Sequence, residues 1–276
     1  MHWHYKQITI HSGIIKFHGE KWYTPYVSDD LKHDQVFVNK VLADMISRVG
    51  VNGSSNKYCV VESDNCTSQY KSRRHFSHMQ DMAEETGMTI IRVYGIAGHG
   101  KGEVDHVGGI VKTAVRREVA NGTKSFYNSY DVVKFVDEKF SSNDDLPTAY
   151  IVKEVHVNEL EVMRNRERRS AFTAMRGSSK FQVMVFSPDR VIRAAPRLCL
   201  CDMCKIKYGS CSIFTSYPLE RNMMTKVFLR ERLQNNLKRI FCTFIIRLKY
   251  VHSSFQIIRF LMNHNTMIVR FKKVRC

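Results

Sequence analysis

The stretch KYCVVESDN at residues 57–65 decides the fold class, and MTIIRVYG at residues 88–95 repeats its pattern. Each contains a short, nearly all-apolar run, which is typical of a strand that is covered on both faces of a sheet. Between them, residues 74–87 favour a helix that ends at Gly87. A strand, a helix and a strand in this order indicate an α/β domain, in which the two strands can be neighbours.

The segments on either side extend this alternation of strands and helices. Residues 2–28 are rich in aromatic and β-branched residues and predict two strands joined by a turn at Gly19 and Glu20. Elsewhere, apolar residues recur at steps of three and four, which is the pattern of an amphipathic helix. These patterns predict helices at residues 36–50, 103–122 and 127–140, followed by strand-like runs at 149–157 and 181–186.

Composition excludes several classes of protein. The chain has 276 residues, of which 43% are hydrophobic and 11% aromatic, so a core can form and global disorder is excluded. Its 14 Gly and 5 Pro are too few for a collagen-like or linker-dominated protein. Charges interrupt the apolar stretches and the N-terminus has no apolar run, so neither a membrane span nor a signal peptide is expected. The eight Cys are therefore expected to be reduced thiols or metal ligands.

The net charge of +17 is uneven along the chain and divides it into three predicted regions. Residues 221–276 hold 13 Lys and Arg against one acid and contain no Gly, Pro or Asp. Such a basic tail can bind phosphate backbones without sequence preference, or it can be sequence that is not part of the fold. We therefore expect a core at residues 1–140, a small β-containing, Cys-rich region at 141–220 and a basic tail at 221–276.

Three acids stand where a strand or a glycine-rich turn meets the next element. Asp64 directly follows the first apolar strand, and Glu103 and Asp105 open the helix after the second. Groups at the carboxyl ends of neighbouring strands line the ligand crevice of an open α/β sheet, and paired acids there can bind Mg²⁺. The alternative is structural: Asp64 forms an Asx-turn, and the other two acids complement the helix dipole.

Four cysteines form the second candidate site, Cys199, Cys201, Cys204 and Cys211. Thiolates are preferred zinc ligands, and a Cys-x2-Cys pair on a tight turn presents two of them to a tetrahedral ion. The alternative is a set of buried free thiols, which are common core residues.

Small groups of basic residues are candidates for contact with nucleic-acid phosphates. They are Lys71, Arg73 and Arg74 in the KSRR stretch, Lys101 and Lys112 around the glycine-rich turn and its helix, and RNRERR at residues 164–169. A solvated surface is the alternative for each of them.

Several motifs are together similar to one protein family. They are HWHYKQITIH (2–11), VSDDLKHD (27–34), VVESDNCTSQYKSRRHF (60–76), GHGKGEVDHVGGIVK (98–112) and CLCDMC (199–204). Over roughly residues 2–215, the chain resembles a family of transposon-related animal proteins that is often present in many copies in invertebrate and fish genomes. The resemblance implies the RNase H-like fold of DDE transposases and integrases, a mixed sheet flanked by helices, with DNA as partner, Mg²⁺ as cofactor and a nuclear location.

The resemblance also assigns roles to the acids. Asp64 corresponds to the acid that ends the fourth strand, and Asp105, with Glu103 as second choice, to the acid on the last helix of the catalytic core. The family's fold has three strands before its first helix, whereas this sequence predicts two. The strand that carries the first catalytic acid is therefore expected to be missing at the N-terminus. Asp29, Asp30 and Asp34 are expected to cap the first helix instead of replacing that acid.

These correspondences imply a truncated copy of a DDE transposase. Its ancestral reaction is Mg²⁺-dependent cleavage and strand transfer of DNA phosphodiesters, and we expect this chain to be catalytically inactive. Two alternatives stay open: a non-catalytic nucleic-acid-binding protein and a zinc-stabilised interaction protein.

Overall fold

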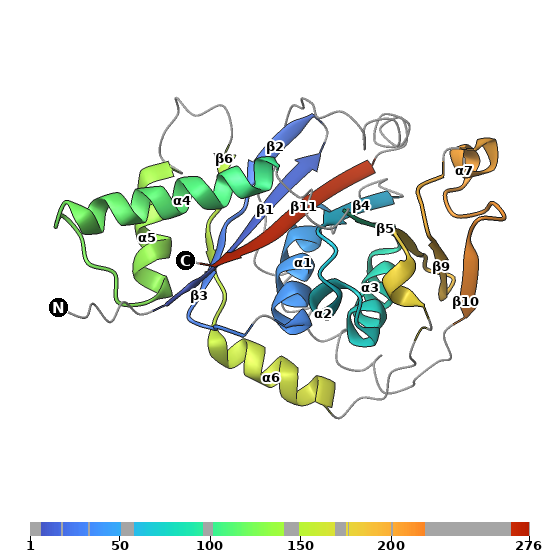
Figure 1. Ribbon diagram of the computed structural model, residues 1–276, viewed down its shortest axis with the longest axis horizontal. Helices are drawn as coiled ribbons and strands as arrows, with labels where there is room; N and C mark the ends of the chain where they lie inside the picture. Colours follow the sequence, from blue (N-terminus) through green and yellow to red (C-terminus); the bar gives the residue numbers. More distant parts are fainter. Residues whose placement is uncertain are drawn as a thin grey trace.

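In the residues that a computed structural model of the chain describes, eleven strands form one mixed sheet with helices on both faces (Figure 1). The structure describes residues 7–17, 19–32, 34–50, 58–95, 102–140, 149–168, 175, 177–199, 201–218 and 266–275. The predicted α/β class, with a mixed sheet flanked by helices and a cysteine cluster, is confirmed. Among these residues, no helix is long and apolar enough to cross a membrane.

The N-terminal segment forms three strands, β1 (Thr9–Phe17), β2 (Glu20–Tyr23) and β3 (Tyr26–Ser28). Gly19 makes the turn between β1 and β2 with a φ of 89°, a conformation that favours glycine. Both β2 and β3 pair antiparallel with β1, so the predicted second strand is present but divided.

The central part follows the order that the apolar runs predict. It comprises α1 (Gln35–Gly50), β4 (Tyr58–Ser63), the short α2 (Thr67–Tyr70), α3 (Arg73–Thr86) and β5 (Thr89–Tyr94). The strands β4 and β5 are parallel neighbours, as expected. Gly87 ends α3 with a φ of 68°. Both α1 and α3 pack against one face of the sheet, where Cys59 and Val61 of β4 join a large buried core.

Two further helices cover the opposite face, above β1. They are α4 (Glu103–Ala120) and α5 (Ser129–Phe140). Val111 of α4 and Val132 of α5 pack with Ile10 of β1, and all three are buried. Helices on both faces therefore enclose the sheet around β1 (Figure 1).

The predicted Cys-rich region does not form a sheet of its own. Its elements are β6 (Ala149–Tyr150), β7 (Lys153–Glu154), α6 (Val157–Arg168), the 3-10 turn Ser178–Lys180, β8 (Val183–Phe186), β9 (Val191–Ala195), α7 (Asp202–Ile206) and β10 (Thr215–Pro218). β6 and β7 add to β2 and β3, and β8 continues the sheet beyond β5. The expected boundary at residue 140 therefore does not separate two sheets.

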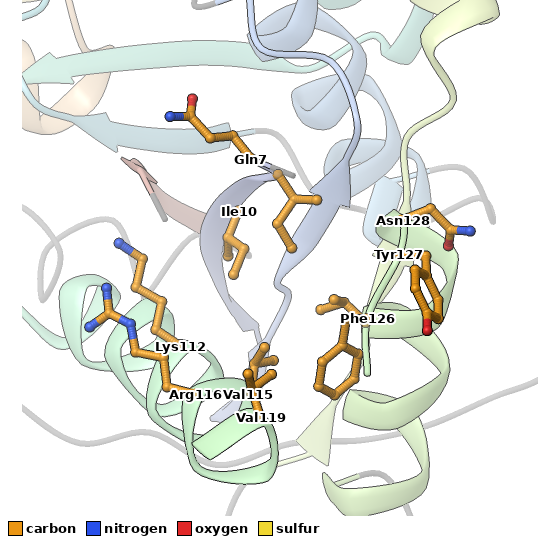
Figure 2. Close-up of a pocket in the computed structure, with 11 residues that line it drawn as sticks. Gln7, Ile10, Lys112, Val115, Arg116, Val119, Phe126, Tyr127 and Asn128 are labelled. Atoms are coloured by element: carbon orange, nitrogen blue, oxygen red, sulfur yellow. The ribbon is translucent and has the colours of Figure 1, made fainter. Parts of the chain in front are cut away.

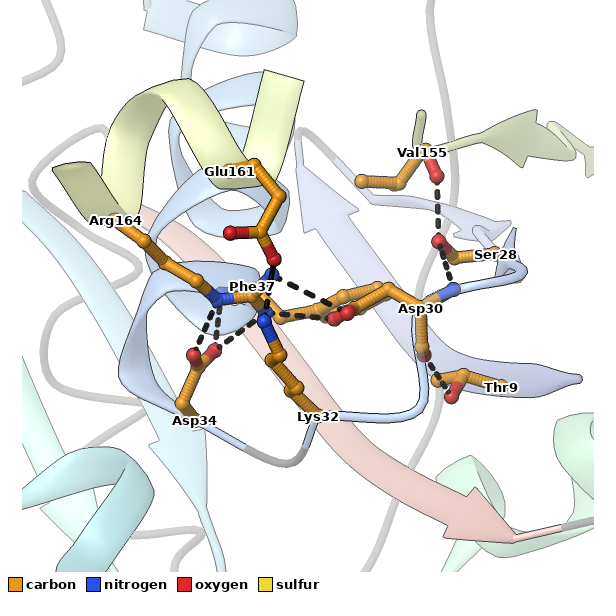
Figure 3. A network of polar contacts seen from close by, with 9 residues as sticks. All are labelled: Thr9, Ser28, Asp30, Lys32, Asp34, Phe37, Val155, Glu161 and Arg164. Atoms are coloured by element: carbon orange, nitrogen blue, oxygen red, sulfur yellow. Dashed lines mark hydrogen bonds and ion pairs between the residues drawn. The ribbon is translucent and has the colours of Figure 1, made fainter. Parts of the chain in front are cut away.

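One residue of the basic stretch on α6, Arg164, is engaged in ion pairs rather than turned to solvent. Arg164 is buried, and its guanidinium donates to Asp30 (Nη2 to Oδ2, 2.7 Å) and Asp34 (Nε to Oδ2, 2.6 Å) (Figure 3). Asp34 also accepts the N–H of Phe37 at 3.3 Å, which confirms it as a cap of α1. Asp29 binds Ser129 instead. Arg164 thus fastens α6 to the turn that begins α1, and a phosphate contact is wrong for this residue.

The end of the predicted basic tail lies in the middle of the sheet. Residues 266–275 form β11 (Thr266–Arg275), which pairs antiparallel with β1 and parallel with β4. Figure 1 shows this strand in red between β1 and β4. The idea that the whole of 221–276 lies outside the fold is therefore wrong for these ten residues, because β11 supplies backbone partners to two strands. Residues 219–265 lie outside the described part of the chain.

A proline in β11 is expected to destabilise the protein strongly. Val269 pairs with Ile15 of β1 and Val61 of β4, so Val269→Pro removes a ladder hydrogen bond inside the sheet. We expect a loss on the order of 3 kcal/mol in the free energy of unfolding, measured by urea denaturation. The control is Ser216→Pro in the edge strand β10, which already contains Pro218. This variant is expected to lose less free energy of unfolding, because an edge strand tolerates proline. An unchanged free energy for Val269→Pro would show that β11 contributes nothing to the sheet.

Candidate functional site

Asp64 lies at the carboxyl end of β4, where the sequence places it, but its carboxylate is used locally. Its Oδ1 accepts the backbone N–H of Cys66 at 3.1 Å, which is the Asx-turn of the structural alternative. Beside it, the N–H of Gly95 donates to the carbonyl of Ser63 at 2.8 Å, so the ends of β4 and β5 lie together. The carboxyl ends of β4 and β5 are therefore neighbours, as predicted, and Asp64 directly follows the first of them.

Asp105 caps the helix that it opens. Its Oδ2 accepts the N–H of Gly102 at 3.2 Å, and the N–H of Asp105 donates to the carbonyl of Gly102 at 2.9 Å. Such reciprocal hydrogen bonds satisfy amides that the first turn of a helix leaves without partners. The structural alternative for Asp105 is thus confirmed.

Glu103 is held by two lysines and a tyrosine from the β1–β2 hairpin. Lys16 Nζ lies 3.0 Å from Oε2, Tyr23 donates its hydroxyl to Oε1 at 2.9 Å, and Lys21 also binds Oε1. Partial burial by itself raises the pKa of Glu103, but the hydrogen bonds from Lys21 and Lys16 outweigh it and lower the pKa to about 2. Glu103 is therefore a carboxylate whose charge is already balanced.

These contacts make the three acids a poor site for Mg²⁺. A Mg²⁺ ion beside Glu103 would be repelled by Lys16 and Lys21. In the part of the chain that the structure describes, none of the three acids belongs to a group of three or more His, Cys or acidic ligands. The donor set that Mg²⁺ needs is thus not assembled at these residues.

The four predicted cysteines do come together. The Sγ atoms of Cys199, Cys201, Cys204 and Cys211 all lie within 4.8 Å of one another. Cys204 and Cys211 are 3.4 Å apart, and Cys211 and Cys199 are 3.5 Å apart. Four sulfurs around a tetrahedral zinc, at about 2.3 Å from the ion, stand about 3.8 Å apart. The cluster therefore has the size and donor chemistry to hold a metal such as zinc.

Backbone N–H groups donate to the sulfurs of the cluster, and at Cys201 they shift the balance toward the thiolate. The N–H of Cys204 donates to Cys201 and, together with the thiol of Cys199, lowers the pKa of Cys201 to about 7. Cys199 accepts the N–H of Cys201, although burial and neighbouring thiols leave its pKa raised. Burial raises the pKa of Cys204 and of Cys211, and each also accepts backbone N–H groups. Such outer hydrogen bonds orient ligands and neutralise part of the charge that four thiolates bring.

The cysteine segment is seated on the sheet, on the face opposite α1 and α3. Cys204 and Tyr208 pack with Val60, Val183 and Val185, which alternate along β4 and β8 with residues of the other core. Gly209 allows the return toward Cys211 with a φ of 90°, and a Cβ there would stand 3.2 Å from Val185. The cluster therefore closes a loop that covers part of the sheet.

The basic residues that the sequence offers as phosphate contacts lie in different environments in the structure. Lys71 is buried and donates to the carbonyls of Ser179 (3.0 Å) and Phe181 (2.7 Å), so its assignment to phosphate is wrong. Burial also lowers the pKa of Lys71. Arg73 is exposed on α3, and Arg74 next to it is half-buried. Lys101 lies outside the described residues, and Lys112 lines a cavity beside α4.

The comparisons with known proteins give one match. A family model described as "Domain of unknown function (DUF8701)" matches residues 1–194. No curated protein and no solved structure matches the chain. The matched region ends before the four cysteines and before β11.

The lysine contacts of Glu103 are expected to stabilise the fold. Glu103→Gln removes the carboxylate charge that lies 3.0 Å from Lys16, a lysine that is only 5% exposed. The folded pKa of about 2 lies below the ordinary value of 4.5, so the stabilisation is present above pH 4.5 and is lost as the pH falls toward 2. We expect the variant to lose roughly 2–3 kcal/mol at pH 7, measured by urea denaturation, and the difference to shrink in acid.

The control for this measurement is Glu138→Gln, which removes the same charge from an exposed pair with Lys124. It is expected to cost less than about 0.5 kcal/mol. Equal losses for the two variants, or a loss at position 103 that does not change with pH, would contradict the role given to Glu103.

Proposed function

This chain belongs to the DUF8701 family, and we propose that it is a zinc-stabilised nucleic-acid-binding protein derived from a DDE transposase, without the Mg²⁺-dependent cleavage of its ancestors. The observation that carries the proposal is the engagement of all three candidate acids. Asp64 closes a turn, Asp105 caps a helix and Glu103 is neutralised by lysines.

The arrangement of the sheet supports an RNase H-like ancestry. The hairpin strands β1 and β2 are antiparallel to each other, and the strands β4 and β5 are parallel to each other. The helices α1 and α3 lie on one face of the sheet, and α4 lies on the other face. β11 lies between β1 and β4, antiparallel to the first and parallel to the second. This is the place and direction that the first strand takes in the fold of the family that the sequence resembles.

The same strand supports the absence of cleavage. The first catalytic acid of a DDE enzyme is carried by that first strand, and β11 reads TMIVRFKKVR, which contains no acid. The set of carboxylates that would hold Mg²⁺ in such an enzyme is therefore incomplete beside Asp64.

Zinc is the metal that the donor set fits. Four thiols whose sulfurs all lie within 4.8 Å of one another, each with a backbone N–H nearby, are typical of a structural site with no open position. When bound, zinc would link Cys199, Cys201, Cys204 and Cys211 and hold the segment against the sheet. Its contribution would be to folding, because the four ligands are unlinked in the unfolded chain.

The cleavage test uses the full chain and supercoiled plasmid DNA. We expect no nicking above the buffer blank with Mg²⁺ or Mn²⁺, because the acids are engaged elsewhere. Gel electrophoresis measures the nicked fraction. Metal-dependent nicking that disappears in both Asp64→Asn and Asp105→Asn would overturn the proposal.

The zinc test uses the full chain purified without a chelator. We expect about one zinc per chain by elemental analysis, and loss of that zinc in Cys204→Ser. Cys66→Ser is the matched control, since Cys66 lies outside the cluster, and it is expected to keep its metal. A metal-free parent protein, or zinc retained after two cluster substitutions, would refute the assignment.

A further inference from the structure

A cavity of about 180 Å³ lies between α4, the start of β1 and the segment that leads into α5 (Figure 2). Its floor is apolar and is formed in part by Ile10 and Val115. The volume is below the roughly 300–1,000 Å³ of pockets for drug-sized ligands, so it suits one ring-sized group.

Two cations stand on one side of this cavity. Lys112 and Arg116 are four residues apart on α4 and so lie on the same face of the helix (Figure 2). Neither forms an ion pair with another residue that the structure describes. Like charges at this spacing repel, and an anion between them would remove the repulsion. The pair therefore favours a ligand with a phosphate or a similar anionic group.

The opposite side of the cavity is aromatic and polar. Phe126 is held by an edge contact with Phe135, with ring centroids 5.3 Å apart. Tyr127 follows it and is 74% exposed, which is unusual for a large aromatic side chain. Asn128 accepts the N–H of Asp131 with its Oδ1, which fixes the orientation of its amide. Aromatic faces and amide groups are the partners that unpaired bases use.

We propose that this cavity binds one nucleotide of a single-stranded nucleic acid. The base enters the apolar floor beside Phe126 and stacks with Tyr127, and the flanking phosphates bind Lys112 and Arg116. This inference rests on the proposed nucleic-acid-binding function and assigns it a site. Duplex DNA does not fit it, because its bases are already stacked and paired.

The test is fluorescence anisotropy of the full chain with a labelled 12-residue oligothymidylate. The double variant Lys112→Glu and Arg116→Glu is expected to weaken binding at least tenfold. It is also expected to reduce the slope of log affinity against log salt concentration by the equivalent of about two phosphate contacts. The matched control is Arg117→Glu on the same helix, outside this cavity, with an effect of less than about threefold.

A second pair of variants tests the base rather than the charge. Tyr127→Ala is expected to weaken binding at least fivefold, and Tyr127→Phe, which keeps the ring, to bind as the parent does. A 12-residue oligonucleotide with abasic sugars should bind more weakly than oligothymidylate and should not respond to Tyr127→Ala.

The outcomes separate the site from the function. Two outcomes would show that the protein binds the oligonucleotide, but not in this cavity. In the first, the abasic strand binds as tightly as oligothymidylate; in the second, Arg117→Glu weakens binding as much as the double variant does. Either outcome refutes this inference and leaves the proposed nucleic-acid-binding function standing. If the parent binds no oligonucleotide at low salt, the nucleic-acid-binding function fails with it.

Discussion

The sheet depends on the two hydrogen-bond ladders that β11 makes. Along one side of β1 and one side of β4, backbone groups have β11 as their partner. Unpaired backbone groups in the middle of a sheet are costly, and each would need water in a place that helices cover on both faces. Ten residues near the C-terminus, Thr266–Arg275, therefore hold together the sheet on which α1, α3 and α4 pack. The two strand ends near Asp64 depend on the same ten residues.

The charged residues divide into those that build the fold and those that remain available. Arg164, Lys16 and Lys71 are each nearly buried and bound to carboxylates or carbonyls, so a basic composition overstates the surface that can meet an anion. Lys112 and Arg116 on α4 lie at a cavity instead. Because a buried charge must be paired, burial separates the structural cations from those that can still meet an anion better than clustering in the sequence does.

Much of the fold follows from local patterns, and what does not follow is non-local. The helices α1, α3 and α4 match the expected period because a single apolar face decides each of them. The strands β4 and β5 match their apolar runs, because both faces of each strand are covered. The spacing of the four cysteines also predicted a cluster correctly. The sequence pattern did not predict the helix α6, because most of its residues are polar and few apolar residues, such as the buried Leu160, mark a helical period. The partners of Glu103 and the place of β11 depend on pairing across 80 residues and more, which no local pattern encodes.

The order in which the chain is synthesised bears on the central strand. The nascent chain emerges with β1 first and β4 soon after, but the strand between them is translated only after β10. Until then, two open strand edges face each other with nothing between them, and such edges are templates for pairing with other chains. Contacts of such long sequence separation also form slowly. Refolding from denaturant, when all strands are present at once, is therefore a different process from folding on the ribosome.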